Sequence, residues 1–179
     1  MTIGEKRKSA IFFDRDGVLN IDKGYVFRSS DFIWIEGAKE AIKLANDNGF
    51  KTFVVTNQSG IARGFYTLED MQALHDWMQQ ELALIGARID RFYYCPYHEV
   101  GDVEAYVIQN HPDRKPNPGM LVRAINDFQI DPEESLLIGD KSSDIEAAEL
   151  VGVEPILFKG GDLFKILRDW LLVRGILQE

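Results

Sequence analysis

Five short apolar runs, each followed by a segment with helical periodicity, most constrain how this chain can fold. The runs are rich in β-branched and aromatic residues and too short for helices, which is typical of buried strands. They occupy 10–13, 51–55, 89–94, 135–138 and 153–158. Helices are predicted over 38–48, 67–85, 118–128, 143–152 and 163–173. Strands that alternate with helices predict an α/β fold, in which a mainly parallel sheet is covered by helices on both faces.

Capping residues help to locate the starts of the helices. Residues 67–70 and 143–146 both resemble capping boxes, in which side chains satisfy the first backbone N–H groups of a helix. Asn117 stands directly before Pro118, and these residue types favour the cap and the first turn of a helix. We therefore expect helices to begin at these three places. We also expect an irregular segment over 95–117, directly before the third predicted helix.

The composition is that of one globular domain over 1–179. Hydrophobic residues make up 45% of the chain and charged residues 27%, and no apolar run approaches the ~20 residues of a membrane span. The polar segment 1–9 lacks the apolar core of a signal peptide. Cys95 has no second cysteine to pair with, so we expect a reducing, cytoplasmic compartment. The net charge of -9 disfavours nucleic acid, and we expect a monomer that contacts neither nucleic acid nor membrane.

Polar residues follow four of the predicted strands at their carboxyl ends. Asp14 and Asp16 follow the first strand, and the segment Thr-Asn-Gln-Ser-Gly at 56–60 follows the second. Arg-Lys at 114–115 closes the loop after the third strand, and Gly-Asp-Lys at 139–141 follows the fourth. Ligands of parallel α/β sheets bind outside the carboxyl ends of the strands. We therefore expect these four clusters to meet on one rim of the sheet.

This set of side chains suits a phosphate ester. Asp14, Asp16 and Asp140 can hold Mg²⁺, a hard cation that prefers oxygen ligands. Mg²⁺ and Lys115 would neutralise the phosphoryl oxygens, to which Thr56 can donate a hydrogen bond. One aspartate can attack phosphorus while another carries the proton of the leaving group. Each cluster alone has an ordinary explanation as a turn, a solvated loop or a helix cap, but their order along four strand ends favours phosphate chemistry.

Across nearly its whole length the chain resembles the haloacid dehalogenase (HAD) superfamily of phosphohydrolases. Asp14-Arg15-Asp16-Gly17 is similar to the first motif of that superfamily, and Thr56-Asn57 to the second. Lys115 is similar to the third motif, and Gly139-Asp140 with Asp144 to the fourth. Longer matches at 14–26, 56–64 and 114–120 resemble the group of phosphatases that act on heptose bisphosphate or histidinol phosphate.

The resemblance implies a fold and a mechanism. The fold would be Rossmann-like and three-layered, with the first strand at the centre and no large cap domain. Asp14 would be the nucleophile and Asp16 the general acid and base, while Thr56 and Lys115 would steady the phosphoryl group. Mg²⁺ would be held by the carboxylates of Asp14 and Asp140 and by the backbone carbonyl of Asp16.

The resemblance also implies a pocket for a small phosphorylated sugar. Arg114 would recognise the remote part of that substrate, for example a second phosphate. The other residues expected to contact the substrate are Asp22, Lys23, Gly24, Tyr25, Asn57, Gln58, Ser59 and Lys141.

The loop after the third strand departs from the pattern of these relatives. In them, a Cys-x-His pair and a Cys-x-Cys pair usually hold a structural zinc ion. Here Cys95 and His98 stand three residues apart, and His111 with Asp113 replaces the second pair. Zn²⁺ prefers thiolate and imidazole ligands in a closed tetrahedron. These four residues remain a candidate zinc set, but we expect ordinary packing of tyrosines to fold the loop.

Three alternative functions stay open at this point. The nearest is a phosphatase for histidinol phosphate or another small sugar phosphate. The second is a receiver-like module whose aspartate is phosphorylated as a signal, although Asp16 would speed the loss of a phosphoryl group from Asp14. The third is a phosphatase for nucleic-acid ends, which the negative net charge disfavours.

Overall fold

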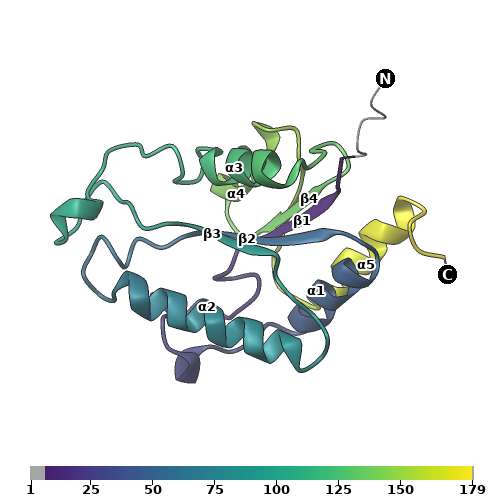
Figure 1. Ribbon diagram of the computed structural model, residues 1–179, viewed down its shortest axis with the longest axis horizontal. Coiled ribbons are helices and arrows are strands. Elements are labelled where there is room, and N and C mark those ends of the chain that lie inside the picture. The colour runs from purple at the N-terminus through teal and green to yellow at the C-terminus, as the bar shows by residue number, and fades with distance from the viewer. Residues whose placement is uncertain (1–6, 179) are drawn as a thin grey trace.

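Figure 1 shows a computed structural model of the chain, which describes residues 7–178. Residues 1–6 lie outside the described residues. They make up most of the polar segment in which no signal peptide is predicted. One parallel sheet has the strand order β3-β2-β1-β4-β5. The strands are β1 (Ala10–Phe13), β2 (Lys51–Asn57), β3 (Arg91–Cys95), β4 (Leu136–Gly139) and β5 (Glu154–Leu157). The predicted parallel sheet, with its first strand at the centre, is therefore confirmed.

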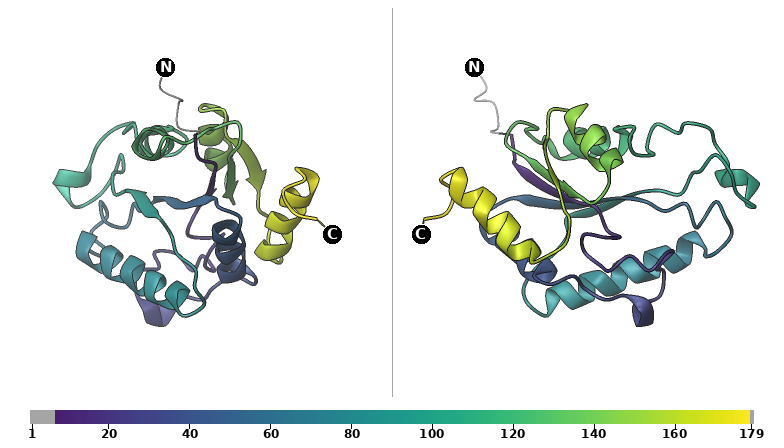
Figure 2. Two further views of the ribbon diagram at one scale, coloured as in Figure 1. Left: turned by 45° about the vertical axis from the view of Figure 1, so that its right-hand side comes forward. Right: turned by 180° about the vertical axis from the view of Figure 1, so that it is seen from behind.

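Helices cover both faces of the sheet, as the alternating pattern predicts. Figures 1 and 2 show α1, α2 and α5 on one face and α3 and α4 on the other. Their bounds are α1 (Ala38–Asp47), α2 (Leu68–Ala83), α3 (Gly119–Phe128), α4 (Ser142–Glu149) and α5 (Leu163–Val173). Ile11 and Phe13 pack in the core beneath α1 and α5, whereas Phe12 packs in the core beneath α3. Burial of each such side chain contributes about 1.5–3 kcal/mol, which makes β1 the buried spine of the fold.

The order of the strands reverses at β1. From β1 the chain moves outward to β2 and β3, then returns to the other side of β1 for β4 and β5. The loops that leave β1 and β4 therefore diverge, and a crevice opens at the carboxyl ends of these strands. Segments 14–37 and 96–118 flank this end of the sheet, and no large cap domain lies within residues 7–178.

Two helix starts differ from the sequence prediction. The Thr67–Asp70 capping box is confirmed, because Asp70 N–H donates to Thr67 Oγ1 and Thr67 N–H donates to Asp70 Oδ2. Asn117 is not the cap of α3, since its side chain donates to Asn110 and to the carbonyl of His111 within the loop. The box predicted over 143–146 is wrong as well: α4 begins at Ser142.

At the start of α4 the capping carboxylate belongs to Asp144 rather than to the predicted Glu146. Asp144 Oδ2 accepts a hydrogen bond from the backbone N–H of Lys141 over 3.0 Å. Asp144 stands three residues after Lys141, which is the spacing from which a side chain can reach back to the cap. The first turn of α4 is thereby fixed next to the end of β4, with Asp144 buried.

The segment between β3 and α3 is largely irregular, as predicted. It contains a single short 3₁₀ turn at Glu104–Tyr106 and projects beyond the body of the sheet at the left of Figure 1. In the part of the chain that the structure describes, no helix combines the length and apolarity needed to cross a membrane.

Candidate active site

A cleft of about 700 Å³ opens at the carboxyl ends of the strands. It brings together the four predicted clusters, since Asp14, Thr56 and Lys115 all contribute to its walls. The other predicted residues that line it are Asp16, Asp22, Gly24, Tyr25, Asn57, Gln58, Ser59, Arg114 and Lys141. Lys23 is exposed and does not line the cleft. The convergence of parallel strand ends thus places nearly every expected residue at one site.

Lys115 forms the centre of charge in the cleft. Its Nζ lies 3.0 Å from Asp14 Oδ1 and 2.5 Å from Asp144 Oδ1, and it donates to the carbonyl of Val55 over 2.7 Å. Lys115 is only 5% exposed. Burial alone would lower the pKa of Lys115, but the adjacent carboxylates of Asp14 and Asp144 outweigh it and raise the pKa above its ordinary value. The ammonium group therefore stays charged at neutral pH.

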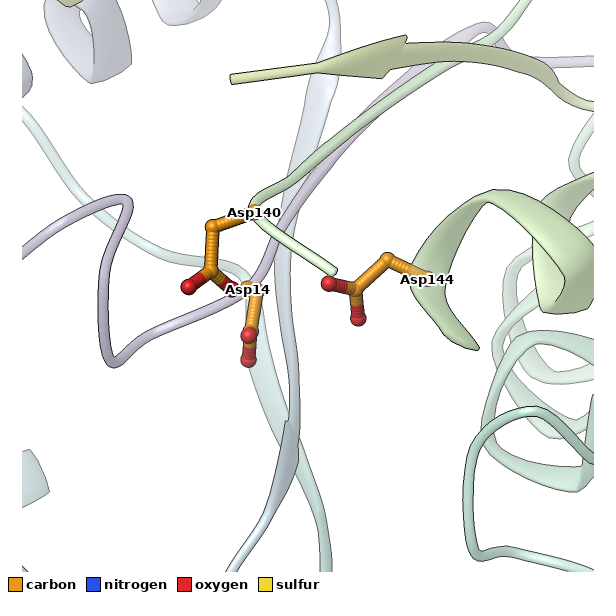
Figure 3. A group of neighbouring side chains, drawn as sticks. All are labelled: Asp14, Asp140 and Asp144. Carbon is orange, nitrogen blue, oxygen red and sulfur yellow. The ribbon is translucent and has the colours of Figure 1, made fainter. Parts of the chain in front are cut away.

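Three carboxylates meet beside Lys115. Figure 3 shows Asp14 from the end of β1, Asp140 from the end of β4 and Asp144 from the start of α4 converging. One oxygen from each lies within 4.8 Å of the others. Burial, together with the charges of Asp144 and Asp16, raises the pKa of Asp14 to about 7, although Lys115 opposes this shift. Burial likewise raises the pKa of Asp140.

This carboxylate group fits a divalent cation. Asp140 Oδ1 is buried and has no hydrogen-bond partner, so it is a free ligand atom. An all-oxygen set of carboxylates is what Mg²⁺ prefers. Gly17 leaves room for the Asp140 carboxylate, because a Cβ at position 17 would collide with it. The backbone of Gly17 has φ +92°, which also favours glycine. Asp144 joins the predicted Asp14 and Asp140, whereas the Asp16 carboxylate lies outside the group, in line with the backbone role expected for it.

The Asp16 carboxylate is held by donors on three sides. Arg15 Nη2 contacts both of its oxygens, at 2.9 and 3.1 Å. Asn20 Nδ2 donates to Oδ1 over 3.0 Å, and Gln58 Nε2 donates to Oδ2 over 2.9 Å. The side chain of Arg15 is fully buried and that of Asp16 is 18% exposed. Asp16 is thus fixed in one orientation and still faces the cleft, as proton transfer requires.

Asn57 and Gln58, both predicted to contact substrate, have side chains that are engaged by the protein. The Asn57 amide donates to the carbonyl of Lys115 over 3.0 Å and accepts from its N–H over 3.1 Å. This pair of bonds ties the loop that carries Lys115 to the end of β2. Gln58 also donates to Thr56 Oγ1 over 2.8 Å. Both residues line the cleft, but their hydrogen bonds position Lys115, Thr56 and Asp16.

Charged side chains surround the mouth of the cleft. Lys141 Nζ lies 3.7 Å from Asp22 Oδ2, and Arg114 Nη1 donates to the carbonyl of Tyr97 over 3.2 Å. Tyr25 is 45% exposed and adopts a positive φ of 55°, which is rare for a residue with a side chain. Arg114 and Lys141 thus provide two cations near the entrance, outside the buried carboxylate group.

The four candidate zinc ligands do not come together. Among the described residues, the group of side chains placed to hold a metal ion consists of Asp14, Asp140 and Asp144. Cys95 Sγ donates to the carbonyl of Tyr97, and His111 stacks on the ring of Tyr97 at 4.0 Å. His98 Nε2 faces Arg63 at 3.3 Å, and Asp113 forms an ion pair with Arg123 at 2.9 Å. The four candidates are thus engaged by Tyr97, Arg63 and Arg123 rather than by one another, so these residues do not fit a zinc ion.

Asp144 and Tyr66 line the cleft, although neither has a role predicted from the sequence. Asp144 was matched to a motif, and its spacing of four residues from Asp140 could have marked it as a third carboxylate. Tyr66 lines the cleft and donates to Gln58 Oε1 over 2.6 Å. No sequence pattern marks Tyr66, because its position depends on the path of the loop after β2.

Comparisons with known proteins agree with this geometry. A family model described as HAD-hydrolase-like matches residues 113–163. The chain is 40% identical over 173 residues to a Rhodopseudomonas palustris protein named D-glycero-beta-D-manno-heptose-1,7-bisphosphate 7-phosphatase, a match that covers 96% of this chain and 95% of that protein. A Burkholderia mallei protein named D-glycero-alpha-D-manno-heptose-1,7-bisphosphate 7-phosphatase is 45% identical over 147 residues. That match covers 82% of this chain and 77% of the B. mallei protein.

A solved structure is similar over nearly the whole fold. It is a D,D-heptose 1,7-bisphosphate phosphatase from B. bronchiseptica complexed with magnesium and phosphate. Its TM-score is 0.80 at 28% sequence identity, and the match covers 92% of this chain and 99% of that chain.

Proposed function

Because the chain belongs to the HAD-like hydrolases, we propose that it is a Mg²⁺-dependent phosphomonoester hydrolase that works through an aspartyl-phosphate intermediate. The observation that carries this proposal is the contact between buried Lys115 and the Asp14 carboxylate at the centre of the cleft. A charged ammonium group there can bind the oxygens of a phosphoryl group and hold it next to the Asp14 nucleophile. Names of the relatives point to the same class of reaction.

The proposed reaction has two steps, both centred on Asp14. In the first step, a carboxylate oxygen of Asp14 attacks phosphorus, and the bond between phosphorus and the sugar oxygen breaks. Asp16 gives its proton to the departing oxygen. In the second step, Asp16 takes a proton from water as the water oxygen attacks phosphorus, which releases phosphate and restores Asp14. Thr56 and Lys115 hold the phosphoryl oxygens in both steps.

Asp14, Asp140 and Asp144 would hold the Mg²⁺ ion, together with the backbone carbonyl of Asp16. When bound, Mg²⁺ supplies positive charge that offsets the negative charge of the phosphoryl group. It would also offset the burial of these carboxylates and their mutual repulsion, which together raise the pKa of Asp14 in the protein without metal.

We propose D-glycero-D-manno-heptose 1,7-bisphosphate as the substrate, with cleavage at the 7-phosphate. The cleft volume of about 700 Å³ suits a phosphorylated sugar. Arg114 and Lys141 at the mouth offer cations for the remote phosphate. The same substrate appears in the names of relatives that are 40–46% identical. Histidinol phosphate and other small sugar phosphates are the alternatives. We also propose that the protein acts in the cytoplasm as a monomer. Light scattering of the purified protein would test the oligomeric state.

A panel of substrates tests this proposal. Phosphate release is measured with the heptose bisphosphate, histidinol phosphate and simple hexose phosphates, each with and without Mg²⁺. We expect the highest kcat/KM for the heptose bisphosphate, loss of activity without Mg²⁺, and no activity in Asp14→Asn. A higher kcat/KM for histidinol phosphate would overturn the substrate assignment, and a stable phosphoprotein without turnover would favour a receiver-like module.

A further inference from the structure

Tyr66 is linked by hydrogen bonds to two groups of the proposed reaction. Its hydroxyl donates to Gln58 Oε1 over 2.6 Å. Gln58 Nε2 in turn donates to Asp16 Oδ2 over 2.9 Å and to Thr56 Oγ1 over 2.8 Å. Tyr66 is 5% exposed and Gln58 is 2% exposed, so water competes little with these bonds. A single hydroxyl group thus lies at the end of a short, buried chain that leads to Asp16.

The hydrogen bond from the Tyr66 hydroxyl fixes which end of the Gln58 amide faces Asp16. Gln58 Nε2 donates to both Asp16 Oδ2 and Thr56 Oγ1, so the amide presents its NH₂ group to these two residues. Gln58 Oε1 then needs a donor on its other side, and Tyr66 supplies it. Burial raises the pKa of Tyr66 above its ordinary value even though the positive charge of Arg15 opposes the shift. The hydroxyl group therefore keeps its proton at neutral pH.

The ring of Tyr66 is held so firmly that its hydroxyl can act as a fixed donor. Phe27 stacks on it with a centroid distance of 5.0 Å and an interplanar angle of 13°. On another side the ring lies against the backbone of Gly60, where an added Cβ would collide with ring atoms of Tyr66. Position 60 therefore needs glycine for space, and this close approach brings the hydroxyl to Gln58.

We propose that Tyr66 is a positioning residue which, through Gln58, holds Asp16 and Thr56 in the geometry that protonation of the leaving group requires. The inference rests on the proposed function, in which Asp16 donates that proton. Without the hydroxyl, Gln58 Oε1 is buried and unpaired. The amide then loses the hydrogen bond that fixes its orientation, and it can rotate. Rotation would turn an oxygen toward the Asp16 carboxylate, where two acceptors repel each other.

The test uses Tyr66→Phe and two substrates that differ in their need for a proton. A sugar phosphate leaves as an alkoxide and needs protonation, whereas p-nitrophenyl phosphate leaves as a stable phenolate and does not. The value of kcat/KM reports the steps up to departure of the leaving group. We expect Tyr66→Phe to lower kcat/KM about 10-fold for the heptose bisphosphate and no more than about 2-fold for p-nitrophenyl phosphate.

Tyr93→Phe is the matched control. It removes another tyrosine hydroxyl from a buried ring, one that donates to Asp127 Oδ2 over 2.9 Å outside the cleft. We expect it to leave kcat/KM unchanged for both substrates. Gln58→Leu should reproduce the selective loss, and adding Tyr66→Phe to Gln58→Leu should cause no further loss, because the two residues act in series.

Equal losses on both substrates in Tyr66→Phe, or no loss on either, would overturn the positioning role. So would a further loss when Tyr66→Phe is added to Gln58→Leu. Failure of the proposed function gives a different result, since Asp14→Asn would then keep its activity toward the sugar phosphate. If Asp14→Asn is inactive while Tyr66→Phe equals the wild type on both substrates, the positioning role alone is wrong.

Discussion

Lys115 Nζ lies 3.0 Å from Asp14 Oδ1, and both residues are 5% exposed. The same ammonium group pairs with Asp144, so it neutralises carboxylates from β1 and from α4. Buried charges are tolerated when they are paired in this way, and removing one partner leaves the other uncompensated. Lys115 therefore links the stability of this end of the sheet to its chemistry.

Replacement of Lys115 is predicted to impair both properties. Lys115→Met keeps much of the volume but leaves Asp14 and Asp144 without their counter-charge, so we expect a loss of about 3–5 kcal/mol in the free energy of unfolding. We also expect kcat/KM to fall about 100- to 1,000-fold, because the phosphoryl oxygens lose a cation. Urea denaturation and phosphate release measure the two effects. Lys165→Met, at an exposed position of α5, is the control and should change neither.

Mg²⁺ is predicted to stabilise the folded protein through Asp140. At a concentration 100 times its Kd, a ligand that binds only the folded state adds about 2.7 kcal/mol of stability. In Asp140→Asn this Mg²⁺-dependent gain in melting temperature should largely disappear. The variant without metal should be no less stable than the wild type, because it lacks a carboxylate whose charged form is disfavoured by burial.

Asp47→Asn removes an exposed carboxylate of α1 and should keep the full response to Mg²⁺. An unaltered Mg²⁺ response in Asp140→Asn would contradict the assignment of this residue as a ligand. Thermal melts with and without Mg²⁺ decide the question without any activity measurement.

His75 is predicted to make stability depend on pH. Its ring is buried, stacks on Phe92 at 4.4 Å and faces Arg15 Nη1 at 3.3 Å. Burial, with the charge of Arg15 adding to it, lowers the pKa of His75 well below its ordinary value. Below about pH 6.5 the unfolded chain therefore takes up a proton that the folded protein excludes, and stability falls as pH falls, by at most about 1.4 kcal/mol per pH unit from this group.

His75→Phe removes this dependence and also the partner of Arg15. At pH 7.5 we expect the variant to be less stable than the wild type by about 1–3 kcal/mol, since Arg15 keeps a buried donor without an acceptor. Between pH 7.5 and 5 the difference should shrink, because only the wild type loses the proton-linked stability. A difference that grows toward pH 5 in urea denaturation would show that the folded protein keeps His75 protonated.

The loop at 96–118 is predicted to fold without zinc. Burial raises the pKa of Cys95 to about 11, so its thiol stays protonated at neutral pH, whereas a zinc ligand must be a thiolate. Elemental analysis of purified protein should find zinc far below one atom per chain, and a chelator should leave the melting temperature unchanged. Stoichiometric zinc, lost together with stability on chelation, would contradict this prediction.

The sequence allowed the sheet and most of the site to be predicted for one physical reason. Parallel strands bring their carboxyl ends to one rim, so Asp14, Thr56 and Asp140 must converge once the strands are located. Register along buried strands is well determined by their apolar residues, and the predicted first strand agrees with β1.

Features that depend on side-chain competition could not be predicted. Asn117 has the right type for a cap, but its amide is used by carbonyl groups of the preceding loop. Tyr66 reaches Gln58 only because Gly60 leaves room for its ring. The zinc question likewise depended on partners distant in sequence, such as Arg63 for His98. Each of these outcomes is decided by a contact between loops, which local patterns do not encode.

Detection of the covalent intermediate tests the central proposal most directly. Protein quenched in acid during turnover is treated with borohydride, which reduces an aspartyl phosphate to homoserine, and the peptide that contains residues 14 and 16 is analysed by mass spectrometry. We predict reduction at Asp14 alone, only when substrate is present, and none in Asp14→Asn. Reduction at Asp16, or rapid phosphate release with Asp14 never modified, would contradict Asp14 as the nucleophile.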